Sequence, residues 1–364
     1  MSGFGAFVDG GLAWNEDGEI VDLRGLSDVF AQPTLNALMA SGPAAWRDAV
    51  AAARSHDGPR VESPRLRLPF EVADYVDFYA SLEHASNLGR MFRPDQEPLL
   101  PNWRWLPVGY HGRAGTVAVS GTDVVRPCGQ LRAGEFGPSQ RLDVELELGF
   151  VVGVPASQPL TTDDFADHVF GVVLVNDWSA RDIQAFEYVP LGPFLGKSFL
   201  TSISAWVTPL TVLEERRLQG PQQDPPPLPH LAGGRDWALD LGLSIELNGE
   251  VISRGNARTL YWTMPQMLAH ATSNGATVRT GDLMATGTIS GAEPGSEGSL
   301  IELYGNTRFL ADGDEVVLRA DGLGEVRGTV TGAAPDGDAL RLCSESCNPC
   351  ASGSWRDWRG QLSR

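Results

Sequence analysis

The chain has 364 residues, of which 42% are hydrophobic, and this length allows two domains or one large domain with an appended unit. Its 28 lysines and arginines stand against 46 aspartates and glutamates, a net charge of −18. Because nucleic acid and anionic membrane surfaces attract positively charged proteins, we expect neither as a partner. The 42 glycines and 25 prolines indicate many turns, as in β-rich folds.

The start of the chain has neither the basic nor the apolar segment of a signal peptide. No apolar run approaches the roughly 20 residues of a membrane-spanning helix. The four cysteines are too few to hold a protein of this size together through disulfides. We therefore expect a soluble protein of the reducing cytoplasm.

Short strands and one helix are predicted in the first part of the chain. Strand-like runs cover residues 5–9 and 20–23, and an alanine-rich stretch with apolar residues at helical spacing predicts a helix over 44–54. The polar stretch 55–64, which contains glycine and proline, indicates a linker.

From residue 65 to about 334 the chain consists mostly of short strand-like runs between Gly, Pro, Asn and Asp. We expect strands over 116–119, 142–154, 169–176, 241–247 and 315–319, and helices over 77–92 and 264–274. The proline-rich stretch 220–234 predicts a surface loop. This pattern favours a β-rich α+β fold with an antiparallel or mixed sheet over a doubly wound one.

Acidic residues alternate with apolar ones from Leu142 to Leu148. Successive side chains of a strand point to opposite faces, so Asp143, Glu145 and Glu147 share one face at spacings of about 6.6–6.8 Å. A solvated outer face is one interpretation. The strand continues with apolar residues on both faces, which favours burial, and buried carboxylates so close together need a cation between them.

A second acidic position, Asp177, follows the apolar run 172–175 and is therefore expected at the end of a strand. Calcium and magnesium prefer oxygen ligands, and carboxylates from separate strands suit them. Zinc is not favoured, because no histidine or cysteine has a suitable spacing here.

Several longer segments resemble the fumarylacetoacetate hydrolase family. They are residues 77–79, His84, Asn87, 91–93, 106–113 (Leu-Pro-Val-Gly-Tyr-His-Gly-Arg), 176–184, 187–199 and 287–291. The run 187–199 is the most specific, since no general turn or strand rule would generate it. The resemblance covers residues 32–328, and the segment 28–46 favours members with a separate N-terminal domain over shorter single-domain relatives.

The resemblance implies a small SH3-like β-barrel at 1–66 and a catalytic metal-binding domain, a mixed β-sandwich roll, at 67–334. A C-terminal tail at 335–364 is expected to be loosely packed or disordered. The family acts as a homodimer with bound Ca²⁺ or Mg²⁺. It hydrolyses a carbon–carbon bond of 4-fumarylacetoacetate to give fumarate and acetoacetate, the last step of tyrosine and phenylalanine degradation.

The resemblance also implies the site residues. The metal ligands would be Asp77, Glu145, Glu147 and Asp177, with Lys197 and Thr201 at a second, magnesium-associated site. Substrate contacts would come from Tyr79, Arg93, Gln184, Tyr188 and Thr288. His84, paired with Glu302, would be the general base, and Arg181, Gln184 and Lys197 would stabilise the leaving group.

The chemistry fits these residue types. A neutral histidine takes a proton from water near pH 7, and a carboxylate on its other nitrogen fixes its tautomer. His84 lies seven residues after Asp77, so on one predicted helix both would share a face.

His111 is the nearest rival for the role of general base, and its alternative is a structural role in a turn. Glu302 lies in a strand-like run.

The chain departs from the family pattern at both ends. It starts roughly twenty residues later than expected, which predicts an incomplete barrel, and Gly328 replaces an expected proline. Cys343, Cys347 and Cys350 in the tail would need an outside ligand to complete a four-ligand metal site.

Two rival functions remain from sequence alone. The first is a hydrolase or decarboxylase acting on another acylpyruvate or diketo acid. The second is a catalytically inactive protein that binds such a small molecule.

Overall fold

The computed structural model describes residues 1–333. The predicted tail at 335–364, with Cys343, Cys347 and Cys350, lies outside the described residues. None of the described helices is both long enough and apolar enough to cross a membrane.

The N-terminal unit is an antiparallel three-stranded sheet with two helices beside it. The strands pair in the order β1 (Ser2–Ala6), β2 (Leu12–Glu16), β3 (Glu19–Asp22), and the helices are α1 (Asn36–Met39) and α2 (Pro43–Ser55). Isolated bridges join this sheet to Arg60, Leu66 and Val207. The helix expected over 44–54 is therefore present, whereas the SH3-like barrel stays a prediction.

An eight-stranded mixed sheet forms the centre of the molecule. Its order is β5 (Gly109–His111), β4 (Asp74–Phe78), β20 (Asp282–Ala285), β11 (Leu146–Val152), β12 (Val169–Asp177), β14 (Thr201–Ile203) and β6 (Val117–Val119), and β15 (Thr208–Pro209) pairs with β12. A five-stranded sheet has the order β19 (Glu250–Asn256), β18 (Gly242–Leu247), β21 (Glu315–Ala320), β22 (Gly324–Thr331) and β7 (Val124–Val125).

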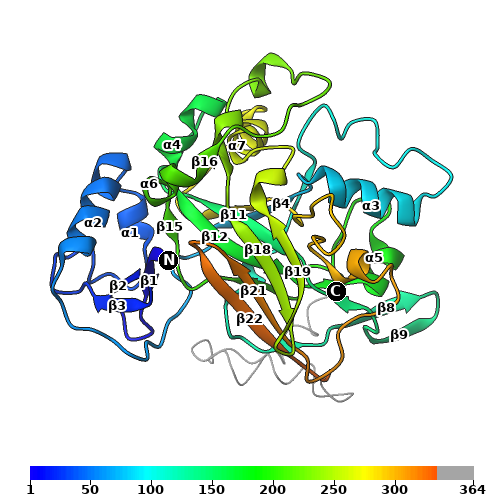
Figure 1. Ribbon diagram of the computed structural model, residues 1–364, viewed down its shortest axis with the longest axis horizontal. Coiled ribbons are helices and arrows are strands. Elements are labelled where there is room, and N and C mark those ends of the chain that lie inside the picture. Colours follow the sequence, from blue (N-terminus) through cyan, green and yellow to red (C-terminus); the bar gives the residue numbers. More distant parts are fainter. Residues whose placement is uncertain (334–364) are drawn as a thin grey trace, which may run out of the picture.

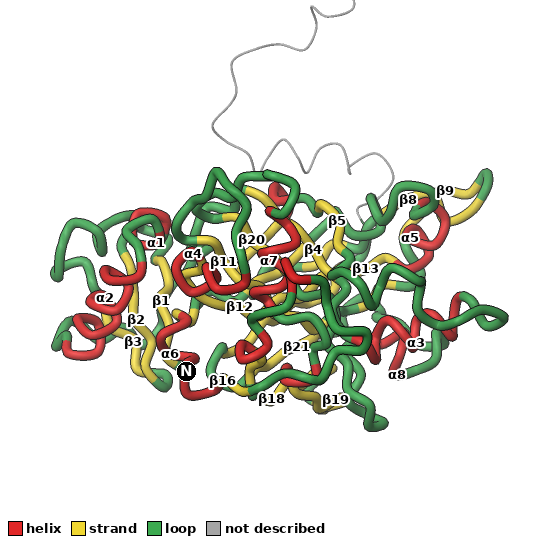
Figure 2. The backbone as a smooth tube through the Cα atoms, turned by 90° about the horizontal axis from the view of Figure 1, so that it is seen from above, coloured by secondary structure: helices red, strands yellow, loops and turns green. Residues whose placement is uncertain are grey.

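Shorter elements surround these sheets. Three two-stranded antiparallel sheets are β8 (Cys128–Arg132) with β9 (Glu135–Pro138), β10 (Leu142–Asp143) with β13 (Ser179–Ala180), and β16 (Arg217–Leu218) with β17 (Ala238–Leu239). The remaining helices are α3 (Leu82–Phe92), α4 (Phe165–His168), α5 (Arg181–Glu187), α6 (Leu210–Leu213), α7 (Met264–Thr272) and α8 (Leu300–Leu303). In both whole-molecule views α3 and α5 lie at the end away from α1 and α2 (Figures 1 and 2).

The central sheet is buried on both faces. Leu148 and Phe150 of β11 belong to the same core cluster as Ile245 and Leu318 of the second sheet. Val151 points the other way, into a core cluster that contains Phe4, Trp14 and Trp46 of the N-terminal unit. Two buried faces explain why β11 and β12 are apolar at consecutive positions instead of alternating.

Three local expectations are wrong. The stretch 77–92 is not one helix, because β4 pairs with β20 and β5 up to Phe78, and α3 begins only after its cap residue Ser81. The strand expected over 142–154 is interrupted after Asp143, where β10 leaves to pair with β13. Glu302 lies in the short helix α8 and not in a strand.

Candidate active site

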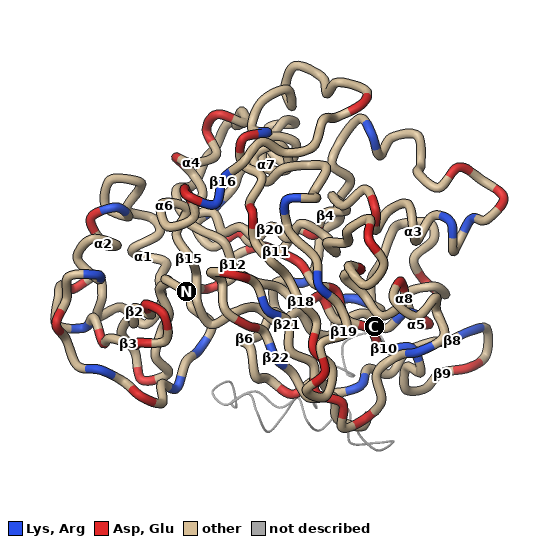
Figure 3. The backbone as a smooth tube through the Cα atoms, in the orientation of Figure 1, with Lys and Arg blue, Asp and Glu red and all other residues tan. Residues whose placement is uncertain are grey.

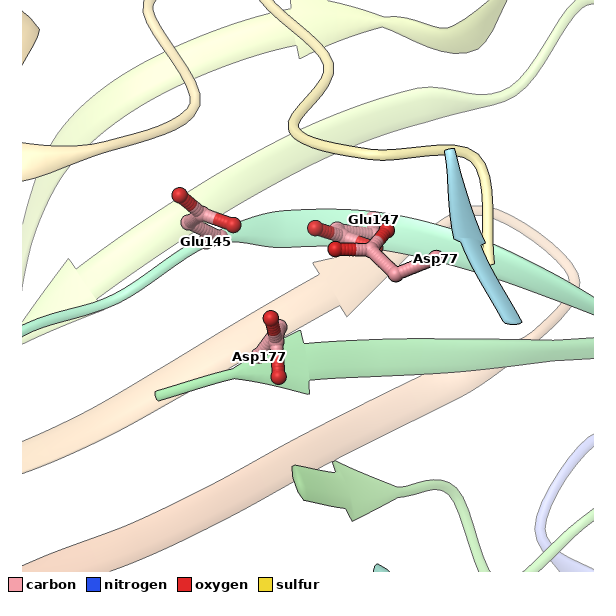
Figure 4. A group of neighbouring side chains, drawn as sticks. All are labelled: Asp77, Glu145, Glu147 and Asp177. Atoms are coloured by element: carbon pink, nitrogen blue, oxygen red, sulfur yellow. The ribbon is translucent and has the colours of Figure 1, made fainter. Parts of the chain in front are cut away.

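Four buried carboxylates converge from three segments of the central sheet. Asp77 lies near the end of β4, Glu145 directly precedes β11, Glu147 lies in β11, and Asp177 ends β12. One oxygen from each lies within 4.8 Å of the others, and Figure 4 shows the side chains of Asp77 and Glu147 close together. The sequence prediction that these four residues form one acidic cluster is confirmed.

The sheet register produces this cluster. β12 runs antiparallel to β11, with Asn176 opposite Leu146, and the Glu145 amide donates to Asn176 Oδ1 at 3.1 Å. On the other side, β20 joins β11 to β4 and places Ala285 opposite Asp77.

Outside this cluster, acidic residues are interspersed with basic ones along the described chain (Figure 3). Asp143, which shares the alternation, is also buried but lies outside the cluster.

Two buried cations compensate part of this charge. Lys197 Nζ contacts Glu145 and lies 2.5 Å from Asp177 Oδ2, and Arg181 lies 2.7 Å from Glu145 Oε1. Burial opposes ionisation of Glu145, but Lys197 and Arg181 outweigh it and hold the pKa of Glu145 well below its ordinary value. Burial likewise opposes the charge of Lys197, but Asp177 and Glu145 raise its pKa.

In the other half of the cluster, at Asp77 and Glu147, the charge of Lys197 acts more weakly and does not outweigh burial. Within residues 1–333, both carboxylate oxygens of Glu147 and the Oδ1 atom of Asp77 are buried without a hydrogen-bond partner. Burial raises the pKa of Glu147, and the charges of Asp77 and Glu145 raise it further. The pKa of Asp77 is raised by burial and then by Asp177. Oxygen ligands without other partners suit a hard divalent cation.

Two hydroxyls hold Asp177. Thr201 Oγ1 donates to its Oδ1 at 2.7 Å, and the Tyr110 hydroxyl donates to its Oδ2 at 3.3 Å. The Lys197 ammonium has no lone pair to offer a cation, so the structure gives its side chain a charge-compensating position. The second magnesium site at Lys197 and Thr201 stays a prediction. Tyr110 had no predicted role, although it lies in the segment 106–113 that carried the family resemblance.

A histidine and a carboxylate form a second buried unit. His84 lies in the first turn of α3, and its Nδ1 is 2.6 Å from Glu302 Oε2 in α8. Asn87 donates to Glu302 at 2.9 Å, Ser290 at 3.0 Å and Ser299 at 2.6 Å. Burial opposes the charge of Glu302, but His84 and these donors lower its pKa to about 2.

The donors around Glu302 were missed at the level of sequence. Asn87 and Ser290 lie in segments that carried the resemblance, but no role was assigned to them. Ser299 carried no signal. The pairing of His84 with Glu302 spans 218 positions, so spacing alone could not reveal it.

Arg181 and Gln184 lie one turn apart on α5. Arg181 is 6% exposed, and its guanidinium lies 2.8 Å from Asp143 Oδ2 and donates to Gln184 Oε1 at 3.2 Å. Since the carbonyl oxygen of Gln184 accepts this bond, its NH₂ group is the end left to donate to a ligand.

These groups line, or lie just behind the wall of, one cavity of about 400 Å³. Its lining includes most of the predicted site residues: Asp77, Tyr79, His84, Arg93, Glu145, Arg181, Gln184, Tyr188, Lys197 and Thr288. Glu147, Asp177, Thr201 and Glu302 do not line it and lie behind this first layer. A wider hollow of about 570 Å³ beside β8 and β9 contains none of these residues.

The predicted substrate contacts differ in exposure. Thr288 Oγ1 and Arg93 Nε are buried without a partner among the described residues, so both are available to a ligand. The ring of Tyr79 packs edge-on against that of His84 at 5.3 Å. Tyr188 is 46% exposed and lies at the mouth of the cavity.

His111 does not line this cavity. It lies exposed on the edge strand β5, opposite Val76, and borders two neighbouring hollows. Its predicted structural role is therefore favoured over a role as the base.

Comparison with known proteins agrees with this geometry. Residues 74–331 match the model of the fumarylacetoacetate hydrolase C-terminal family. Fumarylacetoacetase of Rattus norvegicus is 46% identical over 333 residues, 80% of this chain and 79% of that protein. Fumarylacetoacetase of Arabidopsis thaliana is 44% identical over 352 residues, 84% of this chain and 83% of that protein.

A similar fold occurs among solved structures. A fumarylacetoacetate hydrolase from Exiguobacterium antarcticum superposes with a TM-score of 0.61 at 19% identity, over 91% of this chain and 99% of that one. The family match spans both the carboxylate cluster and the His84–Glu302 pair. The chain belongs to the fumarylacetoacetate hydrolase family.

Proposed function

We propose that this chain hydrolyses the carbon–carbon bond of 4-fumarylacetoacetate to give fumarate and acetoacetate. The observation that carries the proposal is one cavity that joins a buried His–Glu pair, a cluster of four carboxylates and the cations of Arg181 and Lys197. Relatives at 44–46% identity over most of both chains are fumarylacetoacetases, which supports this substrate.

A divalent cation is part of the proposal. The residues fit one, because Glu147 and Asp77 have buried carboxylate oxygens that no group in the described part of the chain hydrogen-bonds, and hard oxygen ligands suit Ca²⁺ or Mg²⁺. Asp77, Glu145, Glu147 and Asp177 would hold it. When bound there, the cation supplies Lewis-acid polarisation of a diketone.

His84 is the base in this reaction. Its Nδ1 is engaged with Glu302, so Nε2 is the nitrogen left to accept a proton from water in the cavity. The ionised Glu302 stabilises the imidazolium that results, and its other donors keep it from taking the proton itself. The resulting hydroxide attacks the ketone carbon of the fumaryl group, whose bond to the CH₂ of the acetoacetyl part is the one to be cleaved.

The bond that then breaks leaves its electron pair on acetoacetate as an enolate. Arg181, Lys197 and the Gln184 NH₂ group donate toward this developing negative charge, and such preorganised donors are often the largest contribution to catalysis. The proton held by His84 returns to the enolate carbon. Arg93, Tyr79, Tyr188 and Thr288 orient the acidic substrate.

The remaining expectations are part of the same proposal. We infer a homodimer, an SH3-like N-terminal barrel up to residue 66 and a cytoplasmic location.

A direct assay tests the function. Purified protein with divalent cation is expected to release fumarate and acetoacetate in equal amounts from fumarylacetoacetate, and to act far more slowly on simple acylpyruvates. Faster cleavage of an acylpyruvate would favour the first rival. Saturable binding without turnover of either would favour an inactive binding protein.

A further inference from the structure

Asp143 is a buried carboxylate whose hydrogen bonds connect two parts of the site. It is 0% exposed and does not line the 400 Å³ cavity. Its Oδ2 accepts from Arg181 Nε at 2.8 Å and from the Ile301 amide at 3.2 Å. Its Oδ1 accepts from the Leu300 amide at 2.8 Å. The residue therefore lies behind the reacting groups and cannot touch a ligand in the cavity.

On one side, Asp143 fixes the guanidinium of Arg181. The main chains are already joined, because β10 pairs with β13 and the Arg181 amide donates to the Arg141 carbonyl at 2.9 Å. With Nε held by Asp143, the planar guanidinium has one orientation, and its Nη1 atom reaches both Glu145 and Gln184. The direction of the cation toward the cavity thus depends on Asp143.

On the other side, Asp143 anchors the helix that carries Glu302. Leu300 and Ile301 are the two residues before Glu302 in α8. A helix of four residues has too few internal hydrogen bonds to hold its own position. Two amides bound to a rigid buried carboxylate supply that position, and with it the 2.6 Å contact between Glu302 and His84.

We propose that Asp143 is a positioning residue that aligns the general base and the leaving-group cation with each other. This proposal rests on the proposed hydrolysis, in which both act on one substrate bond. A misplacement of about 1 Å in such an arrangement can reduce a rate on the order of 10²-fold. Asp143 acts through Arg181 and Glu302 and is not itself catalytic.

The test replaces Asp143 by asparagine. An asparagine of equal size has one acceptor oxygen, so its NH₂ group must face either Arg181 Nε or an amide of α8, which are all donors. We expect kcat to fall roughly 10–100-fold while KM changes less than about threefold, because misalignment affects the reacting groups and not the substrate contacts.

Asp182→Asn is the matched control. Asp182 follows Arg181 directly and accepts from Ser139 Oγ at 2.6 Å and from the Gln140 amide at 2.7 Å, both outside the cavity lining. Like Asp143→Asn, the Asp182→Asn substitution removes one negative charge from a hydrogen-bonded carboxylate. We expect a lower Tm with kcat within about twofold of wild type, since no reacting group moves.

A spectroscopic readout does not depend on activity. The proton between His84 Nδ1 and Glu302 should give a strongly downfield NMR signal, which Asp143→Asn is expected to shift or broaden and Asp182→Asn to leave in place. If Asp143→Asn does not fold, Asp143→Glu, which keeps the charge but displaces it by one methylene, is expected to give the same two changes in smaller measure.

Wild-type kcat and an unchanged signal in a folded Asp143 variant would overturn the proposal, as would equal rate losses in the two asparagine variants. Wild-type protein without turnover of fumarylacetoacetate would refute the proposed function instead. The NMR comparison would then still decide whether Asp143 positions Glu302.

Discussion

The two buried acidic units of this site differ in how completely the chain satisfies them. Glu302 accepts hydrogen bonds from Asn87, Ser290 and Ser299 and pairs with His84. Both oxygens of Glu147 lack a hydrogen-bond partner among the described residues. Burial is common to both, so the difference lies in the neighbours that each carboxylate has.

This contrast indicates which unit works alone and which needs another component. The donors around Glu302 stabilise its ionised form and lower its pKa to about 2. Around Glu147, burial and like charges raise the pKa. The His84–Glu302 pair has its partners within the folded chain, whereas the acidic cluster could hold a divalent cation.

Removal of the cation should have the largest effect. Treatment with EDTA is expected to abolish hydrolysis of fumarylacetoacetate, and added Ca²⁺ or Mg²⁺ to restore it, because the proposed Lewis-acid polarisation of the diketone is lost with the cation. Initial rates before and after chelation measure this. Full activity in excess EDTA would remove the cation from the mechanism.

Loss of the base should come next. His84→Ala is expected to reduce kcat by roughly 10²–10⁴-fold, the usual contribution of a general base, without weakening cation binding, since His84 is not part of the cluster. Steady-state kinetics and a metal titration on one preparation separate the two. Near-normal turnover would assign proton removal to another group.

Loss of the lysine charge should be somewhat milder. Lys197→Met is expected to lower the single-turnover rate on the order of 10²–10³-fold, as for the removal of one donor to an oxyanion. Lys197 also compensates the charges of Glu145 and Asp177. The Tm of the variant must therefore be measured with cation present, because the cation then compensates these carboxylates in place of the lysine. An unchanged rate in the folded variant would leave Arg181 and Gln184 as the donors.

A fourth change should stabilise the metal-free protein. Glu147→Gln removes an uncompensated charge, and we expect Tm without cation to rise by roughly 2–4 °C at pH 7, the shift that about 1 kcal/mol gives in a large domain. With saturating cation, Glu147→Gln should instead lower Tm, because the variant has lost one ligand of the cation. Glu62→Gln, at an exposed position, is the control that should change neither.

The stability of the metal-free protein should also depend on pH through Glu147. The pKa of Glu147 is raised in the folded state, so its stabilising contribution is present below its ordinary pKa of about 4.3 and is lost as the pH rises. Metal-free wild type should therefore lose stability above about pH 4, and Glu147→Gln should lose less. Equal slopes for the two proteins would contradict the raised pKa.

The sequence allowed the cluster to be predicted but not its architecture. Alternation placed Glu145 and Glu147 on one strand face, and the apolar run before Asp177 placed it at a strand end, since both are local patterns. Asp77 was wrongly assigned to one helix with His84. It lies in β4, which is fixed by pairing with β20 more than 200 positions away, and no pattern of neighbouring residues reveals that pairing.

The same limit applies to the layers behind the site. Asp143 belonged to the predicted alternation, but its partners Leu300 and Ile301 are 157 and 158 positions distant. Glu302 alternates with apolar neighbours, which predicts a strand, yet its segment folds as α8, where the distant Asp143 carboxylate accepts from the Leu300 and Ile301 amides. Tertiary contacts decided these cases over local pattern.

Calorimetric titration of metal-free protein with Ca²⁺ or Mg²⁺, in buffers of different ionisation enthalpy, tests most directly whether the cluster is a cation site. Raised pKa values of Glu147 and Asp77 predict that saturable binding releases protons, and that Glu147→Gln releases fewer. Absence of saturable binding, or binding of equal strength and proton release in Glu147→Gln, would contradict a cation held by these four carboxylates.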